Sequence, residues 1–174
     1  MLAVEHGAAH GARLITTEPY TAGQVIARIP DARRVSRPSY RSIQLAPDAH
    51  VEDIGILRYL NHSCRPNCLI DTTTPGLVAG RDVAAGEELT YFYPSTEWDM
   101  DRPFRCRCGV PDCVGVVSGA KHLPPEALRR YPLAPHIRRL LAIGGARGAP
   151  GSRKRPPPGR SVVPAPAGEP EEVR

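Results

Sequence analysis

A compact, mainly β fold is what the sequence predicts for most of the chain. The apolar runs are short, apolar and polar residues alternate within them, and turns rich in Gly and Pro separate them. The length of 174 residues is enough for one domain with a modest core and additional tails. Because no stretch approaches ~18 consecutive apolar residues, we expect no membrane span.

The first half of the chain contains several predicted strands. We treat residues 1–9 as an N-terminal extension. RLITT (13–17) and QVIARIP (24–30) read as strands, and the turn EPYTAG separates them. A polar segment with prolines follows (31–50), within which SIQL (42–45) is a candidate short strand.

Three further predicted strands and a loop follow in the middle of the chain. CLIDTT (68–73) and LVAGRDV (77–83) are strand-like and are joined by TPG, and AAGEELTYFY (84–93) reads as a turn into a strand. Residues 94–120 are rich in Cys, Pro, Gly and Asp. That composition suits a loop that is held by a metal rather than by a core.

The C-terminal part divides into a short helical extension (121–143) and a tail (144–174). PPEALRRYPLAPHIRRLLA begins with Pro, and Pro132 and Pro135 argue against one continuous helix. The tail consists of Gly, Pro and charged residues with almost no large apolar ones, so we expect it to be disordered.

The charge of the chain is mildly basic, with 23 Lys and Arg against 18 Asp and Glu. Such a charge is compatible with an acidic partner but does not show that there is one. Arginines of the tail could contact nucleic acid through its phosphates, but a solvated tail is the simpler interpretation. The N-terminus has no charged start followed by a long apolar run, so we expect an intracellular protein, cytoplasmic in a bacterium and nuclear or cytoplasmic in a eukaryote.

All five cysteines lie between Cys64 and Cys113. Disulfides do not persist in most intracellular proteins, so metal binding or catalysis is favoured. CRCGVPDC (106–113) has the spacing C-x-C-x4-C, which suits tetrahedral zinc with one ligand still to come. Cys64 and Cys68 are the candidates for that ligand, and a His is also possible. A site made only of thiolates is structural, because it leaves no position for a water.

Two other interpretations of the cysteines are open at this point. They could be free thiols in a loop. Alternatively, Cys64 could be a nucleophile with His62 as its base, because residues two apart on an extended chain point to the same side. No separate orienting group or oxyanion motif accompanies that pair.

Three segments together resemble the SET-domain protein methyltransferases with a post-SET zinc segment. They are RYLNHSCRPNC (58–68), GEELTYFY (86–93) and FRCRCGVPDCVG (104–115). HGARLITTEPYTAGQVI (10–26) also looks like the opening of that family. The resemblance covers roughly residues 10–123, with the SET domain over 10–93 and the linker and post-SET segment over 94–120. It implies a mainly β, SET-domain β-clip with knot-like C-terminal threading and a short zinc-bound post-SET loop.

The same resemblance implies an activity: methyl transfer from S-adenosyl-L-methionine to a lysine side chain of a protein substrate. Asn61 and His62 would meet the cofactor through backbone and amide hydrogen bonds. The other residues that the resemblance places at the cofactor are Gly11, Ala12, Arg13, Arg58 and Tyr93. Cys64 would join Cys106, Cys108 and Cys113 around the zinc, which leaves Cys68 as a small buried apolar residue.

Two tyrosines would carry the catalysis. Transfer from a sulfonium to a neutral amine is an in-line displacement, so positioning matters most and no strong base is obligatory. Tyr93 matches the family's catalytic tyrosine, and its hydroxyl would orient the amine. Tyr91, on the same strand face, would hold a water and narrow the room for a methylated amine, so we expect mainly monomethyl-lysine. The alternative is that both are ordinary strand aromatics.

The chain departs from the family pattern at several positions. Arg13 stands where many members have a second Gly, Phe92 replaces a common Asp, and the insert before RYLNH is short. Trp98 and Phe104 could cover the cofactor or the amine, or simply pack. The competing function is therefore a non-catalytic, SET-derived module, stapled by zinc, that binds other proteins.

Overall fold

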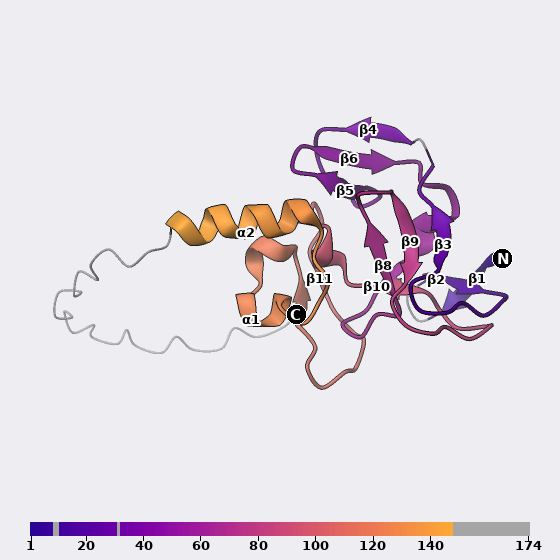
Figure 1. The fold of residues 1–174 in the computed structure, drawn as a ribbon. Helices are drawn as coiled ribbons and strands as arrows, with labels where there is room; N and C mark the ends of the chain where they lie inside the picture. Colours follow the sequence, from indigo (N-terminus) through magenta and orange to yellow (C-terminus); the bar gives the residue numbers. More distant parts are fainter. Residues whose placement is uncertain (9–10, 31, 148–174) are drawn as a thin grey trace, which may run out of the picture.

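The computed structural model describes residues 1–147 apart from 9–10 and 31. Several small β-sheets form one side of the molecule, and the helices and the cysteine-containing segment lie on the other side (Figure 1). The predicted mainly β fold is therefore confirmed. The expected tail lies almost entirely outside the described residues.

The chain starts with a hairpin. Strand β1 (Leu2–Ala8) pairs antiparallel with β2 (Gly11–Thr16). The segment treated above as an N-terminal extension (1–9) thus contains a strand that the sequence did not indicate. The small residues of LAVEHGA weaken its alternating pattern, and the strand is stabilised by its partner and by Leu2 and Val4, which pack against the main core.

Two three-stranded antiparallel sheets follow. One has the order β3 (Val25–Arg28), β9 (Gly76–Ala79), β8 (Cys68–Asp71), and the other has the order β4 (Arg33–Val35), β6 (Ala49–Glu52), β5 (Ile43–Ala46). The second sheet is built from the segment 31–50, in which the sequence indicated only one strand. Its strands are three or four residues long, too short for a clear period of two.

A short parallel contact connects two distant segments. Strand β7 (Asn61–His62) pairs with β10 (Thr90–Tyr91), and the amide of Ser63 donates to the carbonyl of Tyr91 at 3.1 Å. Parallel strands need a crossover connection, and here the β8–β9 hairpin lies within that connection. This return of the chain agrees with the expected knot-like threading.

The remaining elements are short. They are η1 (Gly55–Tyr59), η2 (Tyr93–Ser95), β11 (Phe104–Arg105), β12 (Val116–Val117), η3 (Ala120–His122), α1 (Pro125–Leu128) and α2 (Pro135–Arg147). Residues 144–147, which the sequence assigned to the tail, belong to α2. A helix that is already nucleated and packed continues through two glycines although each costs about 1 kcal/mol.

The buried side chains form two cores. The larger one fills the space between the sheets and contains Cys68. The smaller one joins α1, α2 and the segment with the other cysteines to Phe92, whose ring stacks on Tyr131 with 3.6 Å between centroids. Phe92 thus replaces the common polar residue with an apolar anchor for the C-terminal helices.

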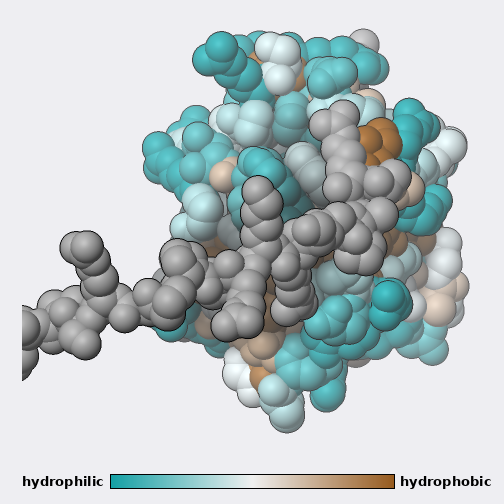
Figure 2. Space-filling model, turned by 90° about the vertical axis from the view of Figure 1, so that its left-hand side faces the viewer, coloured by the Kyte–Doolittle hydropathy of each residue, from teal (hydrophilic) through white to brown (hydrophobic). Residues whose placement is uncertain are grey.

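The outer surface is largely polar. On the side that Figure 2 shows, hydrophilic residues cover most of what the described part of the chain presents, with apolar residues visible between them. None of the described helices is both long enough and apolar enough to cross a membrane.

We expect Asn67→Ala to lower the free energy of unfolding by at least about 2 kcal/mol. The Asn67 amide donates to the Glu88 carbonyl at 2.8 Å, and its oxygen accepts from the Thr90 amide at 2.8 Å. Each buried group that loses its partner costs about 1–3 kcal/mol. Urea denaturation measures the change, with exposed Ser36→Ala as the control. An equally small loss of unfolding free energy in both variants would contradict this structural role of Asn67.

Candidate functional site

The amide of Asn61 connects three segments. Its Nδ2 donates to the carbonyl of Ala12 on β2 at 3.0 Å and to the carboxylate of Glu88 at 2.9 Å. One side chain therefore joins β7 to the first hairpin and to the residues that lead into β10. Asn61 also lines a pocket that is described below.

His62 uses both of its ring nitrogens inside the protein. Nδ1 accepts from the amide of Tyr93 at 3.2 Å, so Nε2 carries the proton and donates to the sulfur of Cys64 at 3.4 Å. Burial lowers the pKa of His62 to about 4, which keeps the ring neutral near pH 7. The side chain thus orients two functional residues and does not act as a base.

Tyr91 and Tyr93 lie side by side, with 4.7 Å between their ring centroids. The hydroxyl of Tyr93 donates to the carbonyl of Leu60 at 2.7 Å. Burial raises the pKa values of both tyrosines above their usual range, and the negative charge of the nearby Glu97 adds to this effect. Both hydroxyls therefore stay protonated, and the hydroxyl oxygen of Tyr93, whose proton is donated to Leu60, can still accept a hydrogen bond.

Two pockets meet at Tyr93. The first has a volume of about 310 Å³ and is lined by Tyr91, Tyr93, Glu97 and Phe104, among others. The second has a volume of about 490 Å³ and is lined by Asn61, His62, Tyr93 and the chain from Phe104 to Cys108. Tyr93 and Phe104 line both pockets and therefore form the wall between them. Two ligands could approach each other there from opposite sides.

The other residues expected at the cofactor lie further away. Arg58 lines the first pocket and not the second, and its guanidinium donates to the Tyr59 hydroxyl at 2.7 Å. Gly11, with φ of 91°, and Ala12 belong to β2 and line neither pocket. Arg13 binds Glu5 across the hairpin at 2.6 Å, so its side chain is held at the surface and fills neither pocket.

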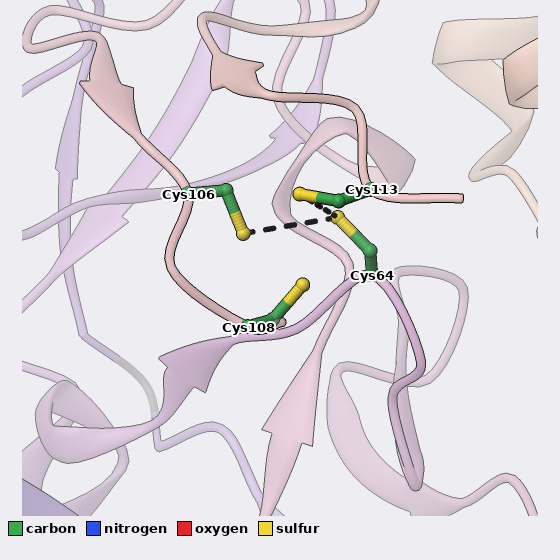
Figure 3. Close-up of side chains that lie close together, drawn as sticks. All are labelled: Cys64, Cys106, Cys108 and Cys113. Atoms are coloured by element: carbon green, nitrogen blue, oxygen red, sulfur yellow. Dashed lines mark hydrogen bonds between the residues drawn. The ribbon is translucent and has the colours of Figure 1, made fainter. Parts of the chain in front are cut away.

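The structure brings four cysteine sulfurs together (Figure 3). The sulfur of Cys64 lies 3.8 Å from those of Cys106 and Cys113, and all four, Cys108 included, lie within 4.8 Å of one another. Four sulfurs at ~2.3 Å from a tetrahedral zinc are about 3.8 Å apart. The cluster is therefore compatible with a structural zinc ion, and Cys68 lies apart from it in the main core.

The surroundings of Cys64 disfavour a free thiolate. Burial raises the pKa of the Cys64 thiol, so this residue needs a metal or a donor to be ionised at neutral pH. The N–H of His62 is such a donor. The nucleophile interpretation of Cys64 and His62 does not fit this geometry, because the His donates its proton to the sulfur and the Cys64 side chain points toward the other three cysteines (Figure 3).

The sequence analysis left two residues undecided and missed one. Phe104 packs edge-on against Tyr93 and His62 at the wall between the pockets, whereas Trp98 packs in the smaller core. The missed residue is Glu97, which is 5% exposed and lines the first pocket. Its only sequence signal is a carboxylate among Tyr, Pro and Trp, which is too general to indicate a site.

Comparison with known proteins agrees with this geometry. The family model for the SET domain matches residues 11–94. The methyltransferase flvH of Aspergillus flavus is 41% identical over 123 residues, which cover 70% of this chain and 69% of flvH.

Other similar proteins are larger. The H3 lysine-36-specific histone-lysine N-methyltransferase of Schizosaccharomyces pombe is 39% identical over 95 residues, which cover 51% of this chain and 11% of that enzyme. In structure, the chain is similar to KRYPTONITE in complex with mCHG DNA and SAH, with a TM-score of 0.54 and 23% identity over 66% of this chain and 28% of that one. This likeness concerns the fold.

Cys113→Ala is expected to abolish stoichiometric zinc binding, because a tetrahedral site loses one of its four ligands. The matched control is Cys68→Ala, which also removes a cysteine sulfur but from outside the cluster. Elemental analysis of the purified variants measures the zinc content. Chelation should in turn expose residues 104–120 to hydrogen exchange before the β-sheets. Equal zinc content in both variants would contradict the site.

Glu97→Gln should stabilise the protein at high pH relative to the wild type. Burial raises the pKa of Glu97 from 4.5 to about 7, so the folded state loses stability as the pH rises from 4.5 through 7. A shift of this size corresponds to about 3 kcal/mol, which the Gln variant does not lose. Denaturant titrations of both proteins at pH 5 and pH 8 measure the difference, and a pH-independent difference would be the contradicting result.

Proposed function

The chain belongs to the SET-domain family of methyltransferases, and on this basis we propose that it transfers a methyl group from S-adenosyl-L-methionine to the side-chain amine of a lysine in a protein substrate. The observation that carries the proposal is the position of Tyr93 in the wall between two pockets. An in-line displacement requires the methyl donor and the amine to approach from opposite sides, and two pockets that adjoin at Tyr93 would allow that approach.

The second pocket is the one that would hold the cofactor. The backbone of Asn61 and His62 supplies hydrogen-bonding groups, and Phe104 supplies an apolar surface. Arg105 and Arg107 add positive charge, which suits the carboxylate of an amino-acid moiety. When bound, S-adenosyl-L-methionine supplies an activated methyl group on a sulfonium. The predicted contacts of Gly11, Ala12, Arg13 and Arg58 with it remain part of this proposal.

The first pocket is the one that would receive the lysine side chain. Its inner part is formed by Leu60, Tyr91 and Tyr93, so an aliphatic chain would lie between aromatic rings. The protonated hydroxyls of the two tyrosines can orient a neutral amine or hold a water beside it. Tyr93 is already turned toward the carbonyl of Leu60, which fixes its hydroxyl at the junction of the pockets.

The zinc would act on structure rather than on the reaction. Cys64, Cys106, Cys108 and Cys113 would hold it and leave no open position for water. Two of these ligands, Cys106 and Cys108, also line the second pocket. Metal binding would therefore order one wall of the cofactor pocket.

The substrate is part of the proposal. The relatives named as H3 lysine-36-specific enzymes favour a histone and a nuclear or cytoplasmic location, but this chain spans only about a tenth of their length. The name of flvH states no substrate. We therefore choose recombinant histone H3 as the first protein to test. Nucleic-acid contact through the arginines of the tail stays a prediction, because that segment lies outside the described residues.

Tyr93→Phe should reduce methyl transfer at least about 100-fold and leave cofactor affinity almost unchanged, because only one orienting hydroxyl is lost. Transfer of labelled methyl groups to histone H3 measures the rate, and calorimetric titration measures S-adenosyl-L-methionine binding. Tyr20→Phe, at a tyrosine that lines neither pocket, is the control. Full activity of Tyr93→Phe would remove this residue from its role. Absence of cofactor binding by the zinc-loaded wild type would favour the non-catalytic, protein-binding module.

The product should be mainly monomethyl-lysine. The buried Tyr91 stands beside Tyr93 and leaves little room for an amine that already carries a methyl group. Tyr91→Phe should shift the product toward dimethyl- and trimethyl-lysine, because it removes a hydroxyl and the water that it would hold. Mass spectrometry of the product distinguishes the three states. Predominant trimethylation by the wild type would contradict the role of Tyr91.

A further inference from the structure

A buried carboxylate lies in the pocket that would receive the amine. Glu97 follows Tyr93 by one turn at η2, and its amide donates to the Tyr93 carbonyl at 3.0 Å. Because of this turn, Glu97 and Tyr93 line the same pocket. Glu97 and Asp101 are the two carboxylates that line this pocket, and Asp101 is exposed, whereas Glu97 is buried.

The carboxylate is satisfied on one side only. Oε1 accepts from the amide of Gln44 at 2.9 Å and from the hydroxyl of Thr96 at 3.1 Å. Within the described part of the chain, no group donates to Oε2. A buried carboxylate costs free energy unless both oxygens have partners. Because the residue lines the pocket, Oε2 is the oxygen that a ligand can reach.

We propose that Glu97 is the residue that receives the substrate amine: Oε2 accepts a hydrogen bond from the incoming ammonium and takes one of its protons before methyl transfer. This inference rests on the proposed function, since it assigns the amine to the same pocket. A lysine arrives protonated at neutral pH, and only the neutral amine has a lone pair to attack the methyl group. A carboxylate at the inner end of the pocket supplies both the attraction and the proton acceptor.

The step balances. The ammonium gives one proton to Oε2, which leaves a neutral amine and a neutral carboxylic acid. The amine nitrogen then forms a bond to the methyl carbon while the bond from that carbon to sulfur breaks, and the sulfur keeps the electron pair. The products are a methylammonium and a neutral thioether. The proton on Glu97 returns to water when the product leaves, which restores the carboxylate.

Three arginines also line this pocket, Arg41, Arg58 and Arg102, and all three are exposed at its mouth. Their charge opposes the entry of a cation, so the attraction for an ammonium has to come from Glu97 and Asp101. Asp101 lies beside Arg102 at 3.7 Å, which offsets part of its charge at the mouth.

The titratable groups closest to Glu97 are neutral near pH 7. Tyr91 and Tyr93 face it from β10 and η2, and burial raises their pKa values. From α2, His136 contacts the Thr96 carbonyl at 2.7 Å, and burial lowers its pKa, as it also lowers the pKa of His50 on β6. Burial raises the pKa of Glu97 itself to about 7, which suits a group that exchanges a proton near neutral pH.

A purely structural role is the competing explanation. Gln44 and the Glu97–Trp98 segment bind each other twice, because the amide of Trp98 also donates to the Gln44 side chain at 2.8 Å. These two hydrogen bonds hold β5 against the turn that contains Glu97. A Gln at position 97 keeps an acceptor for the Gln44 amide but carries no charge. Glu97→Gln therefore separates the two roles.

The test is binding of n-butylammonium, which mimics the end of a lysine side chain, to the zinc-loaded full chain in the presence of S-adenosyl-L-homocysteine. NMR titration measures the affinity for n-butylammonium. We expect the affinity of the wild type to rise about tenfold from pH 6 to pH 8, because Glu97 ionises over this range. At pH 8, Glu97→Gln should bind at least about tenfold more weakly, with no dependence on pH. Neutral n-pentanol should bind both proteins equally.

The control variant is Glu126→Gln, which removes an exposed carboxylate in the first turn of α1 and should behave as the wild type. Thermal melts confirm that each variant is folded. Equal butylammonium affinity of Glu97→Gln and the wild type, or no binding by the wild type at pH 8, would overturn the inference. Glu97-dependent binding without methyl transfer would overturn only the proposed function. Methyl transfer that needs Tyr93, with unchanged binding by Glu97→Gln, would overturn only the role of Glu97.

Discussion

The parallel contact of β7 with β10 is the constraint on which the rest of the site depends. Only two residues from each strand take part, so the contact is too short to persist by itself. Side-chain amides reinforce it: Asn61 binds β2 and Glu88, and the buried Asn67 binds the chain on both sides of Leu89. With this contact in place, Tyr91 and Tyr93 lie beside the Asn61–His62 backbone, and both pockets take shape.

The segment RYLNHSCRPNC (58–68), which contains β7, also supplies the connection to the cysteine cluster. His62 receives a hydrogen bond from the Tyr93 amide and gives one to the sulfur of Cys64. The cysteine cluster and Tyr93 are thereby linked through one imidazole by two hydrogen bonds. The stacking of Phe92 on Tyr131 makes a second connection between β10 and the helical part. Loss of the metal is thus expected to affect the cofactor pocket first and the β-sheets last.

Burial of polar groups is the cost that this arrangement carries. Tyr91, Tyr93 and Glu97 stand together in a place with little water, where each charged form is disfavoured and the pKa values rise. A hydrophobic residue at position 97 would avoid this cost but would leave the Gln44 amide without a partner. A site that must attract a cation and then remove its proton benefits from a carboxylate of this kind. With a pKa near 7, the carboxylate can accept a proton and release it again at neutral pH.

The sequence alone determined the features that depend on local chemistry. The C-x-C-x4-C spacing predicted a metal ligand set with one member missing, and short alternating runs predicted a mainly β fold, because ligand reach and strand period are both local. The tertiary structure decided which residues meet. It brought Cys64 into the cluster and Cys68 into the core, as the family resemblance implied, formed strands from Leu2–Ala8 and Arg33–Val35, and placed Arg58 beside the first pocket. It also turned Glu97 inward, which no local pattern indicates, because the environment of a carboxylate is set by segments far away in the chain.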